Sequence, residues 1–345
     1  MPKTVLRVLY AIQGTGNGHM ARARAILPVL ASFPGVELKV AVSGTQSELD
    51  LPVPVDYRFQ GMSFVYSEHG GIDYVKTFFS ARLDKIMADI VHFPAGNFDL
   101  ILNDFEPVTA YSAKLKGVPC VDMSHQAGVR HTRAARPKKS NLIAEAVLRF
   151  FAPSDRCIGF HFDSFGINYR TPIIRPEIRN LTCSEDGHIL VYLPAYSPEF
   201  LFQFLPLVSD RSFRCFAKTD RVERHQNVTV EPIDNLQFID SFRSASGVLC
   251  SAGFELPAES LFHGKSLAVV PIKGQYEQKC NAAQIATLGV LSLKSDIEKE
   301  LKALIRWAKE LPRIRVDYPD ETKSILQRLF KEFPSQSDLP SYRRG

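Results

Sequence analysis

Residues 247–283 contain one short pattern twice: an apolar strand, a glycine-containing turn and a helix. The segments are, in order, strand 247–250, turn 251–253, helix 255–263, strand 267–270, turn 271–274 and a second helix that begins near Glu277. A strand that leads through a tight turn into a helix, twice in succession, is typical of a parallel sheet covered by helices. Strands and helices alternate along the whole chain, so we expect an α/β fold.

Polar side chains of this segment fall where a ligand can reach them. Gly253 permits close backbone approach in the turn that starts at Ser251, and the next helix offers its N–H groups and positive dipole end to a phosphate. Glu259 could accept both hydroxyls of a ribose, and Glu277 and Gln278 could bind the hydroxyls of a sugar. The alternative is an ordinary αβα unit whose acids are incidental capping residues.

A glycine-rich loop also follows the first predicted strand, Val5–Ile12. Glycines stand at alternate positions, Gly14, Gly16 and Gly18, and His19 follows at once, before a helix. This loop fits the dinucleotide-binding fingerprint only in part, because no acidic residue stands cleanly at the end of the second strand. The sequence therefore disfavours a nicotinamide cofactor.

His19 is a candidate general base, since an imidazole exchanges protons near neutral pH and can remove one from a hydroxyl. Asp104 follows strand 99–103, which lies beside the first strand in a doubly wound sheet, so its carboxylate would orient His19. Glu106 is the rival partner, on the same side of the predicted cleft. The alternative for His19 is a capping or packing role within its loop.

Residues 250–281 resemble the donor-binding signature of the GT-B glycosyltransferases, such as the peptidoglycan N-acetylglucosaminyl transferase and the plant and macrolide UDP-glycosyltransferases. The matching residues are Gly253, Glu259, Gly264, Pro271, Glu277, Gln278 and Asn281. The sequence is most similar to an uncharacterised bacterial and archaeal branch of this superfamily. The resemblance implies two Rossmann-like parallel-sheet domains that face each other across a cleft.

The resemblance also implies roles for the site residues. Glu259 would bind the ribose, and Glu277 and Gln278 would bind the donor sugar. The plant signature usually begins with His-Cys-Gly, whereas Cys250-Ser-Ala-Gly253 has no histidine. Backbone N–H groups near Gly253 would therefore have to hold the diphosphate.

Two further sites belong to the predicted cleft. His125 and Gln126 follow strand 118–122 and resemble the His-Glu-Gln loop of the peptidoglycan transferase, so both would line the acceptor side. His125 is either a second candidate base or a polar loop residue. Ser197 precedes Pro198, the first residue of a predicted helix, and is either a plain N-cap or a ligand of the diphosphate.

Charge and composition restrict the partners. The net charge of +5 is compatible with an anionic nucleotide donor and too weak to indicate nucleic acid. Six cysteines without a CxxC pair indicate reduced thiols and a cytoplasmic protein. No apolar stretch approaches the ~20 residues of a membrane span, and we expect no signal peptide. HExxH and DxD motifs are lacking, and GT-B enzymes generally use no metal, so we expect the nucleotide sugar as co-substrate and no cofactor.

The expected organisation is two domains joined by a proline-containing linker, because two prolines in six residues discourage regular structure. The predicted segments are an acceptor-side Rossmann-like domain (1–168), a linker (169–180), a nucleotide-sugar-binding Rossmann-like domain (181–319), a C-terminal helix that crosses back (320–333) and a flexible tail (334–345).

The first domain also contains a basic loop and an aromatic segment. Five cationic residues lie within 130–139, and aromatic residues lie within Tyr74–Phe79 of a predicted helix 73–92. Together they could contact the inner face of a membrane or a lipid-phosphate acceptor, as in the peptidoglycan transferase. The alternatives are an exposed charged loop beside a core-facing aromatic stripe, or a basic surface that binds an acidic glycan.

The sequence therefore predicts a metal-independent, inverting glycosyltransferase. The donor is a UDP-sugar by resemblance, and the acceptor is a hydroxyl, for example of a cell-envelope glycan or a lipid-linked molecule. One alternative is a nucleotide-sugar hydrolase of the same fold, whose Gly-x-Gly-His-x-x-Arg loop matches Gly16–Arg22. A non-hydrolysing epimerase and a catalytically inactive binding subunit are the others; the presence together of His19, Asp104, Glu259 and Gln278 disfavours the last.

Overall fold

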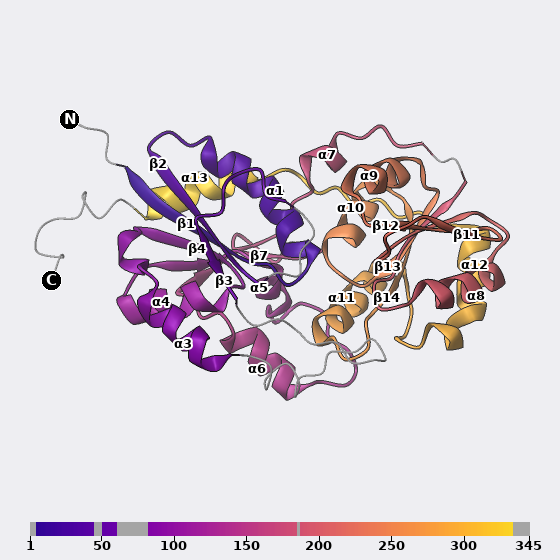
Figure 1. The fold of residues 1–345 in the computed structure, drawn as a ribbon, viewed down its shortest axis with the longest axis horizontal. Helices are drawn as coiled ribbons and strands as arrows, with labels where there is room; N and C mark the ends of the chain where they lie inside the picture. Colours follow the sequence, from indigo (N-terminus) through magenta and orange to yellow (C-terminus); the bar gives the residue numbers. More distant parts are fainter. Residues whose placement is uncertain (1–4, 45–49, 61–81, 185–186, 334–345) are drawn as a thin grey trace, which may run out of the picture.

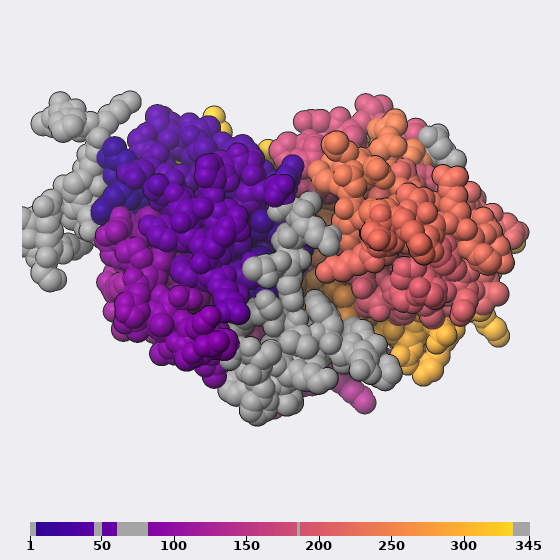
Figure 2. Space-filling model, viewed as in Figure 1, coloured from indigo at the N-terminus to yellow at the C-terminus, as the bar shows by residue number. Residues whose placement is uncertain are grey.

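The computed structural model describes residues 5–44, 50–60, 82–184 and 187–333, which form two α/β domains side by side (Figure 1). Each domain is built on a mostly parallel sheet. This arrangement confirms the predicted fold of two Rossmann-like domains. The space-filling view shows them as two lobes that meet along the middle of the molecule (Figure 2).

The N-terminal sheet has six parallel strands in the order β3-β2-β1-β4-β5-β6. The strands are β1 Leu6–Gln13, β2 Val36–Ser43, β3 Tyr57–Phe59, β4 Leu100–Asp104, β5 Cys120–Asp122 and β6 Arg156–Cys157. This is the strand order of a doubly wound sheet. Asp104, the last residue of β4, is therefore in register with Ile12, near the end of β1.

Short turns connect these strands to the helices of the first domain. The helices are α1 Asn17–Ala31, α3 Leu83–His92, η1 Ala95–Asn97, α4 Pro107–Lys116, α5 His125–Val129 and α6 Leu142–Phe150. A separate two-stranded sheet, β7 Gly159–Phe160 with β8 Tyr169–Arg170, packs on α5. The packing is so close that a Cβ on Gly128 of α5 would lie 2.2 Å from the carbonyl oxygen of Phe160.

The C-terminal sheet repeats the order of the first one. Its order is β11-β12-β10-β9-β13-β14-β15, all parallel except the edge strand β11. The strands are β9 Ile189–Tyr192, β10 Phe213–Ala217, β11 Glu223–His225, β12 Val228–Pro232, β13 Gly247–Ser251, β14 Ser266–Val270 and β15 Leu291–Ser292. Its helices are α8 Pro198–Val208, α9 Asn235–Ser244, α10 Glu255–His263, α11 Tyr276–Thr287, η2 Ile297–Glu300 and α12 Leu301–Glu310.

The central strands of the C-terminal sheet are largely apolar because helices cover both of their faces. Every residue of β13 and of β14 is buried, as expected for strands covered on both faces. One apolar cluster also runs from the N-terminal sheet into the C-terminal domain. Phe162 and Phe254 join the two domains within it, with ring centroids 4.9 Å apart. The domains therefore share a buried contact.

The last helix, α13 (Thr322–Glu332), packs on α1 of the first domain (Figure 1). The rings of Phe33 and Phe330 meet edge to face with centroids 5.0 Å apart. Tyr318, just before α13, is fully buried and donates through its hydroxyl to the carbonyl oxygen of Phe162 at 3.3 Å. The chain thus returns to the N-terminal domain and holds the two domains together.

Some segments differ from the sequence prediction. The proposed linker contains β8 and a short helix, α7 (Pro176–Arg179), because Pro176 is tolerated in the first turn of a helix. His125 and Gln126 were expected in a loop but begin α5, whose N-cap is Ser124. The short strands β3, β11 and β15 were not predicted. The aromatic segment 74–79, the rest of helix 73–92 before residue 82, and the tail 334–345 lie outside the described residues.

Candidate functional site

The glycines of the first loop place it against β2 on one side and near the second domain on the other. The backbone N–H of Gly14 donates to the carbonyl of Ser43 at 2.6 Å, and a Cβ on Gly14 would lie 2.9 Å from Val42 Cγ1. Gly16 is the N-cap of α1. Gly18, in the first turn of α1, faces α10 of the other domain, where a Cβ would lie 3.8 Å from Glu255 Cγ. The loop therefore brings the start of α1 to the domain interface.

His19 and Asp104 form a hydrogen-bonded pair at this edge of the N-terminal sheet. His19 Nδ1 lies 2.8 Å from Asp104 Oδ1, and Asp104 is fully buried whereas 15% of the His19 side chain is exposed. A carboxylate accepts, so Nδ1 carries the proton and Nε2 presents a lone pair. The strand order places these two residues together, and their catalytic roles stay predictions.

Arg22 is a third member of this group. Its Nε donates to Asp104 Oδ2 at 3.0 Å and its Nη2 to Asp104 Oδ1 at 2.7 Å, a bidentate pair. Its Nη1 donates across the interface to Glu255 Oε1 at 2.6 Å. Only 2% of the Arg22 side chain is exposed. The arginine therefore links the His19–Asp104 pair of one domain to α10 of the other.

The buried charged groups shift one another's pKa values. Burial alone would raise the pKa of Asp104, but Arg22 and His19 outweigh it and hold that pKa below its ordinary value. Burial, with contributions from Glu259 and Asp104, raises the pKa of Glu255 to about 8 although Arg22 opposes the shift. The Glu255 carboxyl therefore favours its protonated form more than an exposed glutamate does, even though it accepts a hydrogen bond from Arg22.

Glu255 should make the folded protein less stable as pH rises. Its carboxyl holds a proton up to about pH 8 when folded and only up to about pH 4.3 when unfolded, so stability is lost between these values. Across this window the free energy of unfolding of the wild type should fall by up to a few kcal/mol, and we expect the Glu255→Gln variant to lack this decrease. Urea unfolding at pH 5, 6.5 and 8 measures it. The same slope in both proteins would contradict the assignment, and the variant Glu223→Gln, at a half-exposed carboxyl on β11, is the control.

Gln126 and Glu277 reach His19 from the other side. Gln126 Nε2 donates to Glu277 Oε2 at 2.9 Å and lies 3.4 Å from His19 Nε2. Gln126 belongs to the N-terminal domain and Glu277 to the first turn of α11 in the C-terminal domain. Burial raises the pKa of Glu277, yet 32% of its side chain remains exposed. The structure therefore brings together three residues that the sequence places in different motifs.

His125 occupies a buried position between the domains. Its Nδ1 lies 2.8 Å from the carbonyl of Phe160, its Nε2 lies 2.7 Å from Asn281 Oδ1, and its ring stacks on Phe254 at 3.7 Å. Burial, with a further contribution from His161, lowers the pKa of His125 well below its ordinary value. Both ring nitrogens are engaged and the side chain is not exposed, so this geometry fits interdomain packing rather than a base.

Glu106 does not face the cleft. It is the N-cap of α4, and its carboxylate accepts from the backbone N–H groups of Val108 and Thr109 and from the hydroxyls of Ser43 and Thr109. Glu106 is fully buried. The rival partner of His19 is thus a capping residue, because its oxygens are used within its own turn.

The turn after β13 has open space beside it. Gly253 N donates to the carbonyl of Ser251 at 2.7 Å, and a Cβ on Gly253 would meet no atom within 4 Å. Within the described chain, no side chain caps the helix α10 that follows. Ser197 is exposed and caps α8 by accepting from Phe200 N at 3.3 Å. Gln278 Oε1 accepts from Ile272 N at 2.9 Å and so stabilises the turn before α11.

Glu259 forms a buried ion pair that was not foreseen. Arg175, in the predicted linker, donates through Nε to Glu259 Oε1 at 2.6 Å and through Nη2 to Glu259 Oε2 at 2.9 Å. Their side chains are 6% and 3% exposed. A ribose could bind Glu259 only if Arg175 moves away or if the Glu259 carboxylate accepts hydrogen bonds from the arginine and the ribose at the same time.

The sequence pointed to Asp104 and Glu259 but not to the charged residues that pair with them. Arg22 was noticed only as the last residue of the hydrolase-like loop Gly16–Arg22, Glu255 only as the first residue of helix 255–263, and Arg175 only as part of a linker. Arg22 follows His19 by three residues, and residues three apart lie on the same face of a helix. That spacing was the available signal for Arg22. Arg175 stands beside the buried Ile173 and Ile174, so an isolated charge in an apolar segment was the signal there.

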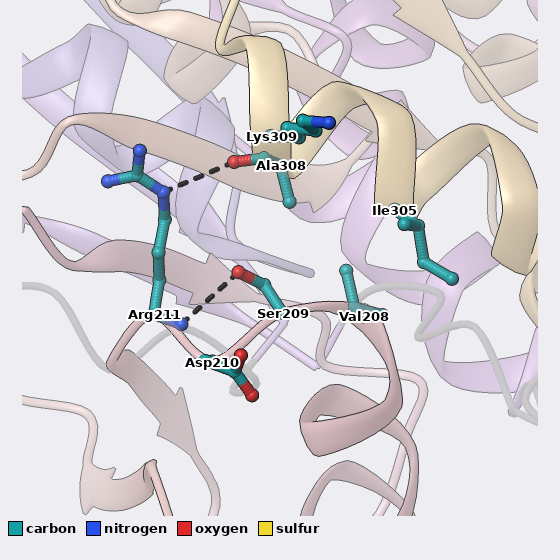
Figure 3. Close-up of a pocket in the computed structure, with 7 residues that line it drawn as sticks. All are labelled: Val208, Ser209, Asp210, Arg211, Ile305, Ala308 and Lys309. Carbon is teal, nitrogen blue, oxygen red and sulfur yellow. Dashed lines mark hydrogen bonds between the residues drawn. The ribbon is translucent and has the colours of Figure 1, made fainter.

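Other features of the described residues lie away from this site. A pocket in the C-terminal domain, between the end of α8 and α12, is on the side remote from the first domain (Figure 3). It is lined by Val208, Ser209, Asp210, Arg211, Ile305, Ala308 and Lys309. Among the described residues, no cluster of His, Cys, Asp or Glu is able to hold a metal ion, and no helix has the length and hydropathy to cross a bilayer. All six cysteines are free thiols, four of them buried.

A family model described as glycosyl transferase family 1 matches residues 6–312. Curated protein sequences yield no match.

Several solved structures share the fold at low sequence identity. MurG of Acinetobacter baumannii has 14% identity and a TM-score of 0.53, over 95% of this chain and 99% of that one. Arabidopsis thaliana UGT89C1 in complex with UDP has 14% identity and a TM-score of 0.57, over 96% and 94%. A UDP-glucosyltransferase from Polygonum tinctorium has 14% identity and a TM-score of 0.58, over 97% and 100%. The two-domain architecture is thus common to all three.

Proposed function

Because the chain belongs to glycosyl transferase family 1 and is a glycosyltransferase of the GT-B fold, we propose that it transfers a sugar from a nucleoside diphosphate sugar to a hydroxyl acceptor with inversion. The proposed donor is a UDP-sugar, since UGT89C1 was solved with UDP. No metal and no further cofactor takes part in the proposed reaction.

The observation that carries this proposal is the His19–Asp104 pair. With Nδ1 bonded to Asp104, His19 offers Nε2 as a proton acceptor beside Gln126 and Glu277. The acceptor hydroxyl gives its proton to Nε2 while its oxygen forms the new bond to the anomeric carbon. The bond from that carbon to the diphosphate breaks, and the nucleoside diphosphate leaves with the electron pair. Attack opposite the leaving group inverts the configuration.

The donor would occupy the turn between β13 and α10. The open space beside Gly253, the absence of a capping side chain on α10 among the described residues, and the positive end of that helix suit a diphosphate. Ser251, in the same turn, and Ser197 would add hydroxyl donors. Glu277, which is partly exposed, would bind the donor sugar, and Gln278 would position that turn.

Gln126 offers a further contact for the acceptor or the sugar. Its Nε2 is committed to Glu277, but no donor among the described residues lies within hydrogen-bond distance of its buried Oε1. A buried acceptor without a partner is costly, and a ligand hydroxyl would satisfy it. Gly16 and Gly18 would let the ligand approach the start of α1.

One face of the first domain suits contact with a membrane, so lipid-linked acceptors belong to the proposal beside soluble ones. Leu142, Ile143 and Phe150 of α6 are largely exposed, and the basic loop 130–139 precedes this helix. Exposed apolar side chains beside cations favour anionic bilayers. We therefore include peripheral contact with the cytoplasmic membrane face in the proposal, and lipid-linked molecules in the acceptor screen.

A thermal-shift screen with UDP, GDP, dTDP and CMP tests the donor site. A ligand at about a hundred times its dissociation constant should stabilise the protein by roughly 2.7 kcal/mol. We expect one nucleotide, UDP, to raise Tm in the wild type and to lose this effect in the Gly253→Val variant. The valine should fold, because a Cβ at this position meets no neighbour within 4 Å, and it should fill the diphosphate space.

The matched control is Gly96→Val, since Gly96 also has open space beside it but lies in η1, away from the interface. No shift with any nucleotide would contradict the proposed donor site.

Donor turnover is then measured with water alone, with free glycans, and with lipid-linked acceptors in anionic vesicles. Turnover in water alone, at the rate seen with acceptors, would favour a nucleotide-sugar hydrolase.

A further inference from the structure

The turn between β13 and α10 is held at two points, one on each side of Gly253. Before the glycine, the carbonyl oxygen of Ala252 accepts a hydrogen bond from Asn281 Nδ2 at 3.1 Å. After it, the ring of Phe254 stacks on the ring of His125, with centroids 3.7 Å apart and planes 10° apart. A Cβ on Gly253 would meet no atom within 4 Å. Both neighbours of the glycine are therefore fixed, while the space beside it stays free for a ligand.

One histidine reaches both of these points. His125 Nε2 lies 2.7 Å from Asn281 Oδ1, so the asparagine links the imidazole to the Ala252 carbonyl. A carbonyl oxygen can only accept, which assigns Nδ2 of Asn281 to Ala252 and leaves Oδ1 for the imidazole. His125 is 1% exposed, and Asn281 and Ala252 are fully buried. Solvent therefore has little access to either contact.

This chain of contacts crosses the domain interface. His125 begins α5 of the N-terminal domain, whereas Asn281 lies in α11 and Ala252 follows β13 of the C-terminal domain. His125 is itself tied to its own domain, since its Nδ1 lies 2.8 Å from the carbonyl oxygen of Phe160. An amide that is held at one end only can rotate, and the imidazole fixes the other end of Asn281. The shape of the turn therefore depends on the contact between the domains.

We propose that His125 and Asn281 are positioning residues for the donor: together they hold the turn 251–254, from the N-terminal domain, in the shape that receives the diphosphate. This inference rests on the proposed function, in which that turn binds the diphosphate. It adds that the acceptor-side domain shapes the donor site, so that donor affinity depends on a buried histidine of the other domain.

A rigid turn matters here because the backbone carries the binding. The sequence Cys250-Ser-Ala-Gly253 has no histidine, so the proposed diphosphate contacts are N–H groups near Gly253 and the positive end of α10. Such groups bind well when neighbouring side chains already hold them in the productive geometry. A turn without these contacts would have to become ordered on binding, and that ordering lowers affinity.

Hydrogen exchange of the full-length protein without ligand tests whether the turn is held. His125→Phe keeps a ring on Phe254 but removes both ring nitrogens, and Asn281→Leu removes the amide. We expect either variant to speed exchange in peptides that contain residues 251–254 and to leave the turn 193–197, between β9 and α8, unchanged. His125→Gln offers an amide N–H in place of Nε2 and should restore slow exchange. Unchanged exchange at 251–254 in a folded variant would overturn the inference.

Calorimetric titration with UDP, and competition of uridine against UDP, tests whether the donor depends on the turn. We expect His125→Phe and Asn281→Leu to raise the Kd of UDP about tenfold, equivalent to about 1.4 kcal/mol, the size of one or two hydrogen bonds. Uridine lacks the diphosphate, so its Kd should change much less. A merely structural role would lower Tm without ligand and leave the Kd of UDP unchanged. An equal loss for UDP and uridine would also contradict the inference.

The matched control is His161→Phe. His161 is fully buried, its ring centroid lies 5.8 Å from that of His125, and neither ring nitrogen has a hydrogen-bond partner among the described residues. The variant therefore changes the same part of the core without removing a hydrogen bond, and exchange at 251–254 and the Kd of UDP should stay as in the wild type. Far-UV circular dichroism and Tm establish which variants fold, and Asn281→Leu serves where His125→Phe does not.

The two measurements separate this inference from the proposed function. If the wild type binds none of the nucleotides, the proposed function is contradicted, and exchange at 251–254 still decides whether His125 and Asn281 hold the turn. If the wild type binds UDP and both folded variants bind it equally well, the inference is wrong and the proposed function stands.

Discussion

Replacing His19 with alanine is expected to lower the rate of sugar transfer by at least about a hundred-fold and to leave nucleotide binding unchanged. General-base catalysis typically contributes about 10²- to 10⁴-fold, and the variant removes the Nε2 that would receive the acceptor proton. Asp104 stays paired with Arg22 through both oxygens, so the fold should be retained. Steady-state kinetics with the nucleotide sugar found by thermal shift measure the rate, and the shift itself measures binding.

The control for this experiment is His225→Ala, since His225 is exposed on the edge strand β11, remote from the first domain. It should transfer sugar as the wild type does. Unchanged turnover in His19→Ala would remove His19 from the mechanism, even if nucleotide binding persists. Loss of nucleotide binding as well would mean that His19 holds the donor rather than the acceptor proton.

The position of His19 beside Asp104 could be predicted because it follows from topology alone. Apolar strands, glycine turns and helices alternate along the sequence, and that alternation leads to a doubly wound sheet. In such a sheet the first and fourth strands are neighbours, so the residues that end them meet. Asp104 ends β4 and His19 lies in the first turn of α1, which follows β1, so the strand order brings them to the same edge of the sheet. The strand order did not by itself decide between Asp104 and Glu106 as the partner of His19.

The partners of the buried charges could not be predicted in the same way. Arg22 meets Glu255 across 233 residues of sequence, and Arg175 meets Glu259 across 84. The first contact depends on how the two domains pack against each other, and the second on how the segment around α7 packs on α10. Local sequence patterns specify neither. Glu259 and Glu106 show the result. Glu259 was expected to bind the ribose and Glu106 was the rival partner of His19, yet the carboxylate of each accepts hydrogen bonds from other protein groups.

Glu259→Ala is expected to destabilise the protein by about 3–5 kcal/mol. The change would leave the Arg175 side chain, which is 6% exposed, without the carboxylate that accepts two of its hydrogen bonds, and an unpaired buried charge carries a cost of this size. Asn235 Oδ1, at 3.3 Å from Nη1, and Glu177 Oε1, at 3.9 Å, replace only part of that interaction. Urea unfolding at pH 7 measures the difference.

A control variant and a measurement of nucleotide binding decide whether Glu259 stabilises the fold or binds the ribose. Arg214 and Glu231 form the same two-pronged pair, with Nε–Oε1 2.7 Å and Nη2–Oε2 3.0 Å, but 27% of the Arg214 side chain is exposed. Glu231→Ala should therefore cost only about 1 kcal/mol or less. If Glu259→Ala is instead as stable as the wild type but no longer binds nucleotide, the ribose role holds and the ion pair is dispensable. A large loss of stability with nucleotide affinity retained would make Glu259 a structural anchor for the segment before α7, and the ribose contact would then belong to another side chain.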